Sequence, residues 1–470
     1  MKKHIYIVVI LSLLAGATSC KKWLDVKPRD KVVEDDLFSS EAGFLTALNG
    51  VYLNMCDSTS YGMEMTMRFT EVLGQRYKIA SDHYLYQVNN YQYKEPAVQQ
   101  RISSVWRSAY ANVANLNVLI DKANARRNVL SVNHYNWIKG EAMALRAFLQ
   151  FDILRLFGPV YSKDSSLRCI PYYTTFSTQY NPLLKGSEAM VKILNDLDSA
   201  AILLKDEPVV TGNTDGTGWG SRRLRMNYYA VKALTARACL YRGDKASALQ
   251  QAKEVIRQAD VLFPFVKLNA IVGEVKNPDR VFSTELIFAL RDLRLNSTYR
   301  RLFDPALPEI TILYTAQSRL TTEFESNTND YRYGNMWMQP GSNQKSYRCF
   351  YKYADVEEFS KPFRNLIPLI RVSEMYFIAA ECEPDPAAAL AYLNMVRKNR
   401  GISDAPPTAA MNTELQKDYR REFYGEGQMF FWYKRNATGS VPAGSGSGNV
   451  AMTASQYVVP LPDSETQYRD

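Results

Sequence analysis

Apolar side chains recur at the spacing of an α-helix in several segments of the chain. Six of them before Gly158-Pro159 are separated by three, one, four, three and one residues: Leu145, Phe148, Leu149, Ile153, Leu156 and Phe157. This spacing places them on one face of a helix, which we expect to end at the glycine-proline pair. A second amphipathic pattern precedes it, with Trp106, Val113, Leu116, Asn117 and Ile120, and breaks near residues 128–133. Together they predict a helical hairpin near residues 98–158.

A clearer hairpin is predicted over residues 227–259. Its first helix is lined by Val231, Leu234, Ala238 and Tyr241, and its second, after a turn at Gly243-Asp244, by Leu249, Ala252, Ile256 and Ala259. The small residues let both helices approach closely, and the pattern resembles a tetratricopeptide repeat of about 34 residues. A comparable pair is expected over residues 371–401, and another amphipathic helix over 187–204. The pattern therefore predicts a helical scaffold.

Long stretches without a clean period separate these helices. They cover residues 57–96, 211–223, 296–362 and 438–450, and they are rich in Tyr, Asn, Gly, Pro or Ser. Irregular segments of this length are usually functional or disordered. We therefore expect the helical scaffold to carry large irregular insertions.

The charge and the motif content narrow the class of function. The chain has 470 residues and a formal net charge of +9, and its basic residues are scattered. Without a polybasic arm we expect no nucleic acid partner. Only three histidines occur, and GxSxG, HExxH, Walker A and GxGxxG motifs are absent. We therefore expect no catalysis, no cofactor and no metal site.

Two chemical alternatives stay open in the sequence. A glycan-degrading enzyme would need a carboxylate pair at the base of a cleft, whereas pairs such as Glu381 and Glu383 are expected to be solvated or capping residues. The segment 212–216 partly resembles a calcium loop, but Arg222 stands where the bidentate Glu belongs. A flexible glycine-rich turn is the favoured interpretation there.

Residues 1–19 are predicted to be a lipoprotein signal peptide. Lys2 and Lys3 precede an apolar run of ten residues, Ile5 to Leu14, and small residues then lead to Cys20. The run falls short of the roughly 20 residues that span a bilayer. The Cys20 thiolate is suited to receive a diacylglyceryl group, and several acyl chains give stable anchoring. The alternative is an ordinary signal peptide followed by a free Cys, because Ala17 stands where a lipobox prefers Leu.

Cleavage before Cys20 would change the charge and leave five further cysteines. Loss of Lys2 and Lys3 lowers the net charge from +9 to +7. The other cysteines have no CxxC spacing and are expected to be core residues or to form one or two disulfides: Cys56, Cys169, Cys239, Cys349 and Cys382. Their pairing stays open.

Several motifs, in order along the mature chain, resemble the SusD/RagB family of outer-membrane lipoproteins from Bacteroidota. They are Asp36-Leu37-Phe38, Ala47 to Tyr52, the set Trp106, Tyr110 and Asn115, the run Gly140 to Val160, and Tyr457 to Pro462. Met429, Trp432 and Asn436 stand where many members have Arg, Asp and Trp, so the chain resembles a variant branch whose ligand need not be starch. Lys21-Lys22 also replaces the acidic pair that often marks surface export.

The resemblance implies one all-α, SusD-like domain over residues 20–470. Its tetratricopeptide-like helix pairs would form a scaffold that docks against a SusC-like, TonB-dependent transporter. The irregular segments would bind oligosaccharide, without catalysis, on the outer membrane. A peptide-binding member of the same family and an envelope scaffold that binds only protein are the alternatives.

Candidate ligand contacts are aromatic and polar residues in the irregular segments, because sugar C–H faces stack on aromatic rings. They are Tyr84, Tyr86, Asn90, Tyr91 and Tyr93 in the first segment, Trp219 and Arg222 in the glycine-rich loop, and Tyr331, Arg332, Tyr333, Trp337 and Tyr347 in the third. The competing interpretation is packing: Tyr84 with Tyr86, and Tyr91 with Tyr93, are spaced as in half-buried strands. Trp106, Trp137 and Trp432 are expected to be core residues.

Overall fold

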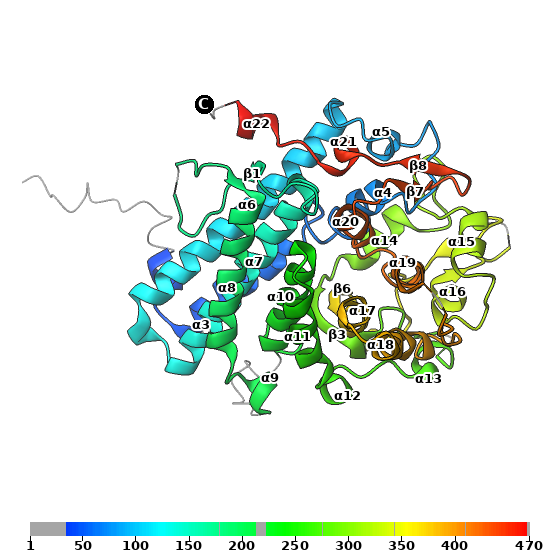
Figure 1. The fold of residues 1–470 in the computed structure, drawn as a ribbon. Coiled ribbons are helices and arrows are strands. Elements are labelled where there is room, and N and C mark those ends of the chain that lie inside the picture. The colour runs from blue at the N-terminus through cyan, green and yellow to red at the C-terminus, as the bar shows by residue number, and fades with distance from the viewer. Residues whose placement is uncertain are drawn as a thin grey trace, which may run out of the picture.

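Helices dominate the computed structural model, which describes residues 34–177, 179–212, 222–274, 276–342, 344–408 and 410–467 (Figure 1). The longer helices are α3 (Glu41–Met55), α6 (Pro96–Ala125), α7 (Val132–Phe157), α8 (Gly186–Leu204), α10 (Tyr228–Arg242), α11 (Lys245–Ile256), α17 (Val372–Cys382), α18 (Pro386–Lys398) and α19 (Met411–Glu422). The fold is all-α in class, as the sequence predicts.

The long helices pack in succession. α7 packs between α6 and α8, α8 contacts α10, α10 pairs with α11, and α11 leads through α17 to α18. Figure 1 shows this succession from the cyan and green helices to the orange ones. Side chains cap several helix starts, with Ser131 before α7, Asn227 before α10 and Asp385 before α18. The helices expected from periodicity are confirmed, and α7 ends one residue before Gly158.

Shorter helices and turns fill the irregular segments. The short helices are α4 (Phe69–Leu73), α5 (Tyr86–Asn89), α9 (Pro208–Thr211), α12 (Ala259–Leu262), α13 (Leu268–Ile271), α14 (Leu295–Leu302), α15 (Gln317–Glu323), α16 (Tyr331–Met336), α20 (Met429–Arg435), α21 (Ala454–Tyr457) and α22 (Asp463–Thr466), with 3-10 turns η2 (Arg127–Val129) and η3 (Ser283–Glu285). These segments are therefore largely ordered around the scaffold.

Four antiparallel strand pairs complete the described part of the chain. They are β1 (Arg168–Ile170) with β2 (Leu184–Lys185), β3 (Leu286–Arg291) with β6 (Leu366–Arg371), β4 (Trp337–Met338) with β5 (Cys349–Phe350), and β7 (Ser440–Pro442) with β8 (Asn449–Ala451). The β3–β6 pair is almost fully buried and leads directly into α17. Short apolar runs of this kind carry no period that separates a strand from a buried helix.

The run Gly140 to Val160 has a packing role that the structure makes explicit. A Cβ at Gly140 would lie 2.8 Å from Leu204 Cγ, so the glycine lets α7 approach α8. Arg146 Nη2 and Nε donate to the two Asp196 carboxylate oxygens at 2.7 and 2.8 Å, joining the same two helices. The glycine and this ion pair therefore hold α7 against α8.

A second buried charge network joins the end of α19 to the strand pair. Arg400 donates to Glu422 at 2.6 and 3.0 Å and to Glu285 at 2.6 and 2.9 Å, and Arg371 also pairs with Glu422. Burial alone would raise the pKa of Glu422, but the guanidinium groups of Arg400 and Arg371 hold it well below its usual range. The positive guanidinium groups and the negative carboxylates therefore neutralise each other inside the core.

Two further expectations concern the membrane and the cysteines. Within the described residues, every helix is too short or too polar to cross a bilayer. The five cysteines Cys56, Cys169, Cys239, Cys349 and Cys382 are buried free thiols. They are core residues, and the disulfide alternative is not realised among them. Residues 1–19 and Cys20 lie outside the described residues.

Candidate functional site

Arg332 and Trp337 are enclosed by the core, which corrects their assignment as ligand contacts. Each side chain is about 1% exposed. Arg332 donates to Asp330 at 2.6 and 2.9 Å and to Glu422 at 2.9 Å. Trp337 packs on Phe350 and Tyr424, with ring centroids 4.7 and 5.0 Å away. Both residues therefore anchor the third irregular segment to the core.

Three other predicted ligand contacts form internal ion pairs or hydrogen bonds instead. Arg222 is buried between Glu141 and Glu207, and Tyr93 is buried with its hydroxyl on the carbonyl of Gln456 at 2.6 Å. Tyr91 is half-buried at a positive φ of 55°, and its hydroxyl donates to the carbonyl of Leu73 at 2.8 Å. These three residues are not available as a shared binding surface.

The remaining predicted ligand contacts are buried, half-buried, exposed or outside the described residues. Tyr333 is buried against Phe324, and Tyr331 is half-buried beside Gly401. Trp219 and the calcium-like segment beyond Gly212 lie outside the described residues. Asn90 is exposed and donates to the carbonyl of Tyr86 at 2.8 Å. The third segment therefore keeps only Tyr347 as a strong candidate.

Tyr84 and Tyr86 are exposed, so the alternative of half-buried strands is wrong for this pair. Their side chains are 41% and 38% exposed, and Tyr86 begins the short helix α5. Tyr84 stacks on His83 with ring centroids 4.7 Å apart, and the Arg101 guanidinium lies 5.6 Å from the centre of the Tyr84 ring. The ring of Tyr84 is thus held in place while much of it stays open to solvent.

Tyr347 stacks on Tyr314, a residue that the sequence analysis did not select. The ring centroids are 4.1 Å apart and the planes differ by 19°. Tyr347 Oη donates to Glu309 Oε1 at 2.7 Å, and Lys345 Nζ donates to the same oxygen at 2.9 Å. Burial opposes ionisation of Glu309, but these hydrogen bonds lower its pKa overall. The result is a fixed aromatic pair with a carboxylate and an ammonium group beside it.

The first and third irregular segments meet at these residues. The backbone N–H of Lys78 donates to the carbonyl of Tyr314 at 2.7 Å, and the Lys78 ammonium lies 5.8 Å from the Tyr314 ring. His83 interacts with the backbone of Thr311 and Ile312, and burial keeps its pKa below the ordinary value. We call this set of residues the tyrosine platform. Its exposed or half-buried members are Lys78, Tyr84, Tyr86, Glu309, Lys345 and Tyr347, and His83 and Tyr314 are its buried members.

Comparison with known families identifies the family of this chain. Residues 22–216 match a SusD-like family model described as starch-binding and associating with the outer membrane. Residues 283–469 match the model of the SusD family. The chain belongs to the SusD family. The two matched stretches include both segments that form the tyrosine platform.

Individual SusD-family relatives are distant in sequence and close in fold. SusD-like protein P2 of Formosa agariphila is 26% identical over 261 residues, which are 54% of this chain and 46% of that protein, so the match spans about half the relative's length. A SusD superfamily crystal structure from Bacteroides thetaiotaomicron superposes with a TM-score of 0.72 at 20% identity, covering 91% of this chain and 98% of that one. Surface glycan-binding protein A of Bacteroides uniformis gives 0.69 at 16% identity, with the same coverages of 91% and 98%.

Several platform residues were not predicted from the sequence, although their positions along the chain gave a partial signal. Tyr314 and Glu309 lie in the same irregular segment as Tyr347, and Lys78 and His83 precede Tyr84. Their proximity depends on contacts between segments more than 200 residues apart, such as that from Lys78 to Tyr314. A one-dimensional pattern does not record such contacts.

A separate aromatic hollow lies beside the middle of α6. It has a volume of about 230 Å³, and its lining includes Tyr110, Asn117, Tyr173, Phe176 and Tyr180. Phe176 is 61% exposed, and Tyr110 packs edge-on against Tyr173 at 5.5 Å. This hollow is somewhat smaller than the roughly 300–1,000 Å³ of drug-sized ligand pockets, but its aromatic lining makes it a competing location for a sugar on this SusD-family chain.

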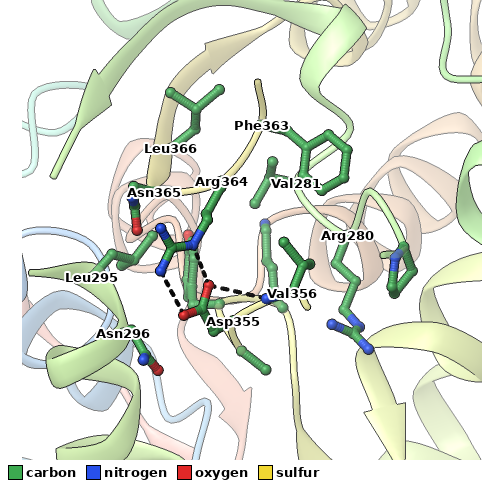
Figure 2. Close-up of a pocket in the computed structure, with 14 residues that line it drawn as sticks. Arg280, Val281, Leu295, Asn296, Asp355, Val356, Phe363, Arg364, Asn365 and Leu366 are labelled. Atoms are coloured by element: carbon green, nitrogen blue, oxygen red, sulfur yellow. Dashed lines mark hydrogen bonds and ion pairs between the residues drawn. The ribbon is translucent and has the colours of Figure 1, made fainter. Parts of the chain in front are cut away.

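A polar pocket between α14 and the approach to β6 is too small for a sugar ring. Figure 2 shows Asp355 facing Arg364 across it, with the two carboxylate oxygens 2.7 and 2.9 Å from the guanidinium nitrogens. Arg280 and Asn296 also line this pocket. Its volume of about 30 Å³ suits water molecules, each of which needs roughly 10–15 Å³.

The acidic residues Glu381 and Glu383 both lie in ion pairs. Glu381 pairs with Arg435 at 2.6 Å, and Glu383 pairs with Lys253 at 2.7 Å. Lys276 pairs with Glu357 at 3.1 Å on the exposed surface. In the part of the chain that the structure describes, no group of three or more His, Cys, Asp or Glu side chains is arranged to hold a metal ion.

Proposed function

We propose that this SusD-family protein binds an oligosaccharide at the tyrosine platform and delivers it to a SusC-like, TonB-dependent transporter. The single observation that carries the proposal is the junction of two distant irregular segments, one holding Tyr84 and Tyr86 and the other Tyr347, through Lys78 and His83. Aromatic faces stack on sugar rings, and the nearby Glu309 and Lys345 can hydrogen-bond to hydroxyl groups. In this role the protein has no catalytic function.

Two relatives of the same fold support a glycan as the ligand. One is a laminarin-binding SusD-like protein, with a TM-score of 0.67 at 17% identity and coverages of 91% and 98%. The other is the surface glycan-binding protein of Bacteroides uniformis. The platform residues of this chain supply the chemistry that such a ligand needs, without specifying which glycan it is.

The location of the protein is part of the same proposal. Cys20 would carry the lipid that anchors the chain to the outer membrane, with the binding surface facing the exterior. A Cys20→Ala chain expressed in its own type of host should move from the membrane fraction to the soluble fraction. Metabolic labelling with a fatty acid should mark the parent chain and leave the variant unlabelled.

The binding proposal is tested with a glycan array followed by calorimetric titration of the best glycan. We expect saturable binding to at least one oligosaccharide. Binding to peptides, with none to glycans, would overturn the sugar assignment in favour of the peptide-binding alternative. Binding only to envelope proteins would favour the scaffold alternative.

A further inference from the structure

A small cavity lies where α7, α10, α17, α19 and α20 meet. Its volume is about 40 Å³, more than one water molecule requires and far less than a sugar ring. Three arginines line it from three different helices: Arg155 from α7, Arg237 from α10 and Arg435 from α20. It is separate from the platform residues, none of which lines it.

Three hydrogen-bond donors on the wall of this cavity lack an acceptor among the described residues. They are Arg237 Nη1, Tyr241 Oη and Trp432 Nε1, and each of these atoms is buried. Arg237 and Tyr241 are only 6% and 4% exposed. A buried donor without an acceptor is energetically costly and rare in folded proteins, so three in one place indicate a missing acceptor.

The other polar groups of the cavity do not supply that acceptor. Glu374 also lines it, but Arg237 Nε and Nη2 already occupy both carboxylate oxygens at 2.6 Å each. The side-chain oxygen of Gln428 accepts from Arg155 Nη1 at 3.1 Å. The unpartnered groups are all N–H or O–H donors, and indole and guanidinium nitrogens cannot accept.

Each arginine that lines the cavity already has a carboxylate partner. Arg155 pairs with Asp152, Arg237 with Glu374 and Arg435 with Glu381. The neighbouring Lys434 is fully buried, and its ammonium donates to the carbonyls of Leu156 and Gly158 at 3.1 and 2.7 Å. No carboxylate among the described residues pairs with Lys434. Burial lowers the pKa of Lys434 to about 7, so this residue carries only part of a positive charge at neutral pH.

We propose that this cavity binds a single monovalent anion of chloride size, which accepts from Arg237, Tyr241 and Trp432 and joins α10 to α20. A chloride ion accepts several hydrogen bonds and donates none, which matches a wall of unpartnered donors. The anion site stabilises the scaffold and is independent of the glycan site.

The test compares thermal unfolding of the purified protein in sodium chloride and in sodium gluconate at one ionic strength. Gluconate is too large for the cavity, so the midpoint should rise by about 2 °C as chloride replaces it. Crystals containing bromide should show an anomalous peak within about 3.5 Å of Tyr241 Oη and Trp432 Nε1. Tyr241→Phe removes one donor and should reduce the chloride effect.

The matched control is Tyr457→Phe. Tyr457 is also buried, but its hydroxyl donates to the carbonyl of Thr438 at 2.7 Å and does not line the cavity. This variant should keep the full chloride effect even if its midpoint falls. Equal midpoints in chloride and gluconate, or bromide crystals with only water in the cavity, would overturn the proposal, and neither result requires the variants to fold.

Discussion

Tyr347 lies flat against Tyr314, with ring centroids 4.1 Å apart, and both hydroxyl groups are associated with Glu309. Burial, followed by the charge of Glu309, raises the pKa of Tyr314 to about 12. Both phenols are therefore protonated at neutral pH and act as hydrogen-bond donors. The stacked pair is a preorganised part of the tyrosine platform, and so it should contribute to binding without a large ordering cost.

Replacing Tyr347 by alanine should weaken glycan binding about tenfold. Aromatic stacking is worth roughly 0.5–1.5 kcal/mol beyond the area it buries, and 1.4 kcal/mol corresponds to a factor of ten in Kd. Tyr84→Ala should have a similar effect, because its ring is exposed on the neighbouring segment. Calorimetric titration with the best glycan measures both variants, and Tyr347→Phe separates the ring from its bond to Glu309.

Two exposed phenylalanines, Phe359 and Phe176, provide controls for these tyrosine substitutions. Phe359 is 73% exposed, contacts Arg364 and is not one of the platform residues, so Phe359→Ala should leave Kd unchanged. Phe176 belongs to the competing aromatic hollow. If Phe176→Ala abolishes binding while Tyr84→Ala and Tyr347→Ala do not, the glycan binds beside α6 and the platform assignment fails.

Arg332→Met should destabilise the fold by roughly 3–5 kcal/mol. The substitution leaves Asp330 and Glu422 with one less cation inside the core, and an uncompensated buried charge carries a cost of this size. Lys276→Ala is the surface comparison, since its bridge to Glu357 is more than half exposed at both ends and should cost less than about 1 kcal/mol. Urea unfolding at pH 7 measures both. A loss below 1 kcal/mol for Arg332→Met would contradict the buried role.

The long helices were predictable because their apolar periodicity reflects a local rule. In α7 the residues Leu145, Leu149 and Ile153 all face the core, and Gly158 ends the helix where expected. The strand pair β3–β6 was not predictable in the same way. Its pairing joins Leu286 to Arg371 and Arg291 to Leu366, which lie about 80 residues apart.

The candidate site was predictable by segment and only partly by residue. Polar and aromatic residues in loops look alike in sequence whether they serve the core or the surface. Arg332 and Trp337 proved to be core residues because Glu422 and Tyr424, about 90 residues later, pack against them. Tyr314 joined the platform because Lys78 reaches its backbone from the first segment. Long-range contacts of this kind decide between the two interpretations.

All five cysteines of the described chain should be unreactive in the folded protein and reactive after unfolding. Burial raises the pKa of Cys56, Cys349 and Cys382 to about 12 and that of Cys169 and Cys239 to about 11. A thiol reagent at pH 8 should therefore count no thiols in a chain lacking Cys20 and five in denaturant. A count of three or one in denaturant would show one or two disulfides instead.

Glu71 should make the protein less stable as pH rises from about 4.5 to about 7. Burial raises its pKa to about 7, and Arg76 together with the N–H groups of Gly425 and Gly427 offsets only part of this shift. The folded state therefore holds the Glu71 proton more tightly than the unfolded chain. Stability from this proton is complete below the unfolded pKa and is lost as pH passes the folded pKa.

Glu71→Gln should remove that contribution, which is up to about 3 kcal/mol across this interval. The amide keeps an oxygen for the N–H of Gly427, which donates to Glu71 Oε1 at 2.9 Å. Urea unfolding at intervals from pH 4.5 to pH 8 should show a flatter profile for the variant than for the parent protein. Glu357→Gln, on an exposed side chain, should leave the profile unchanged. Parallel profiles for parent and Glu71→Gln would show that Glu71 is ionised in the folded protein throughout this range.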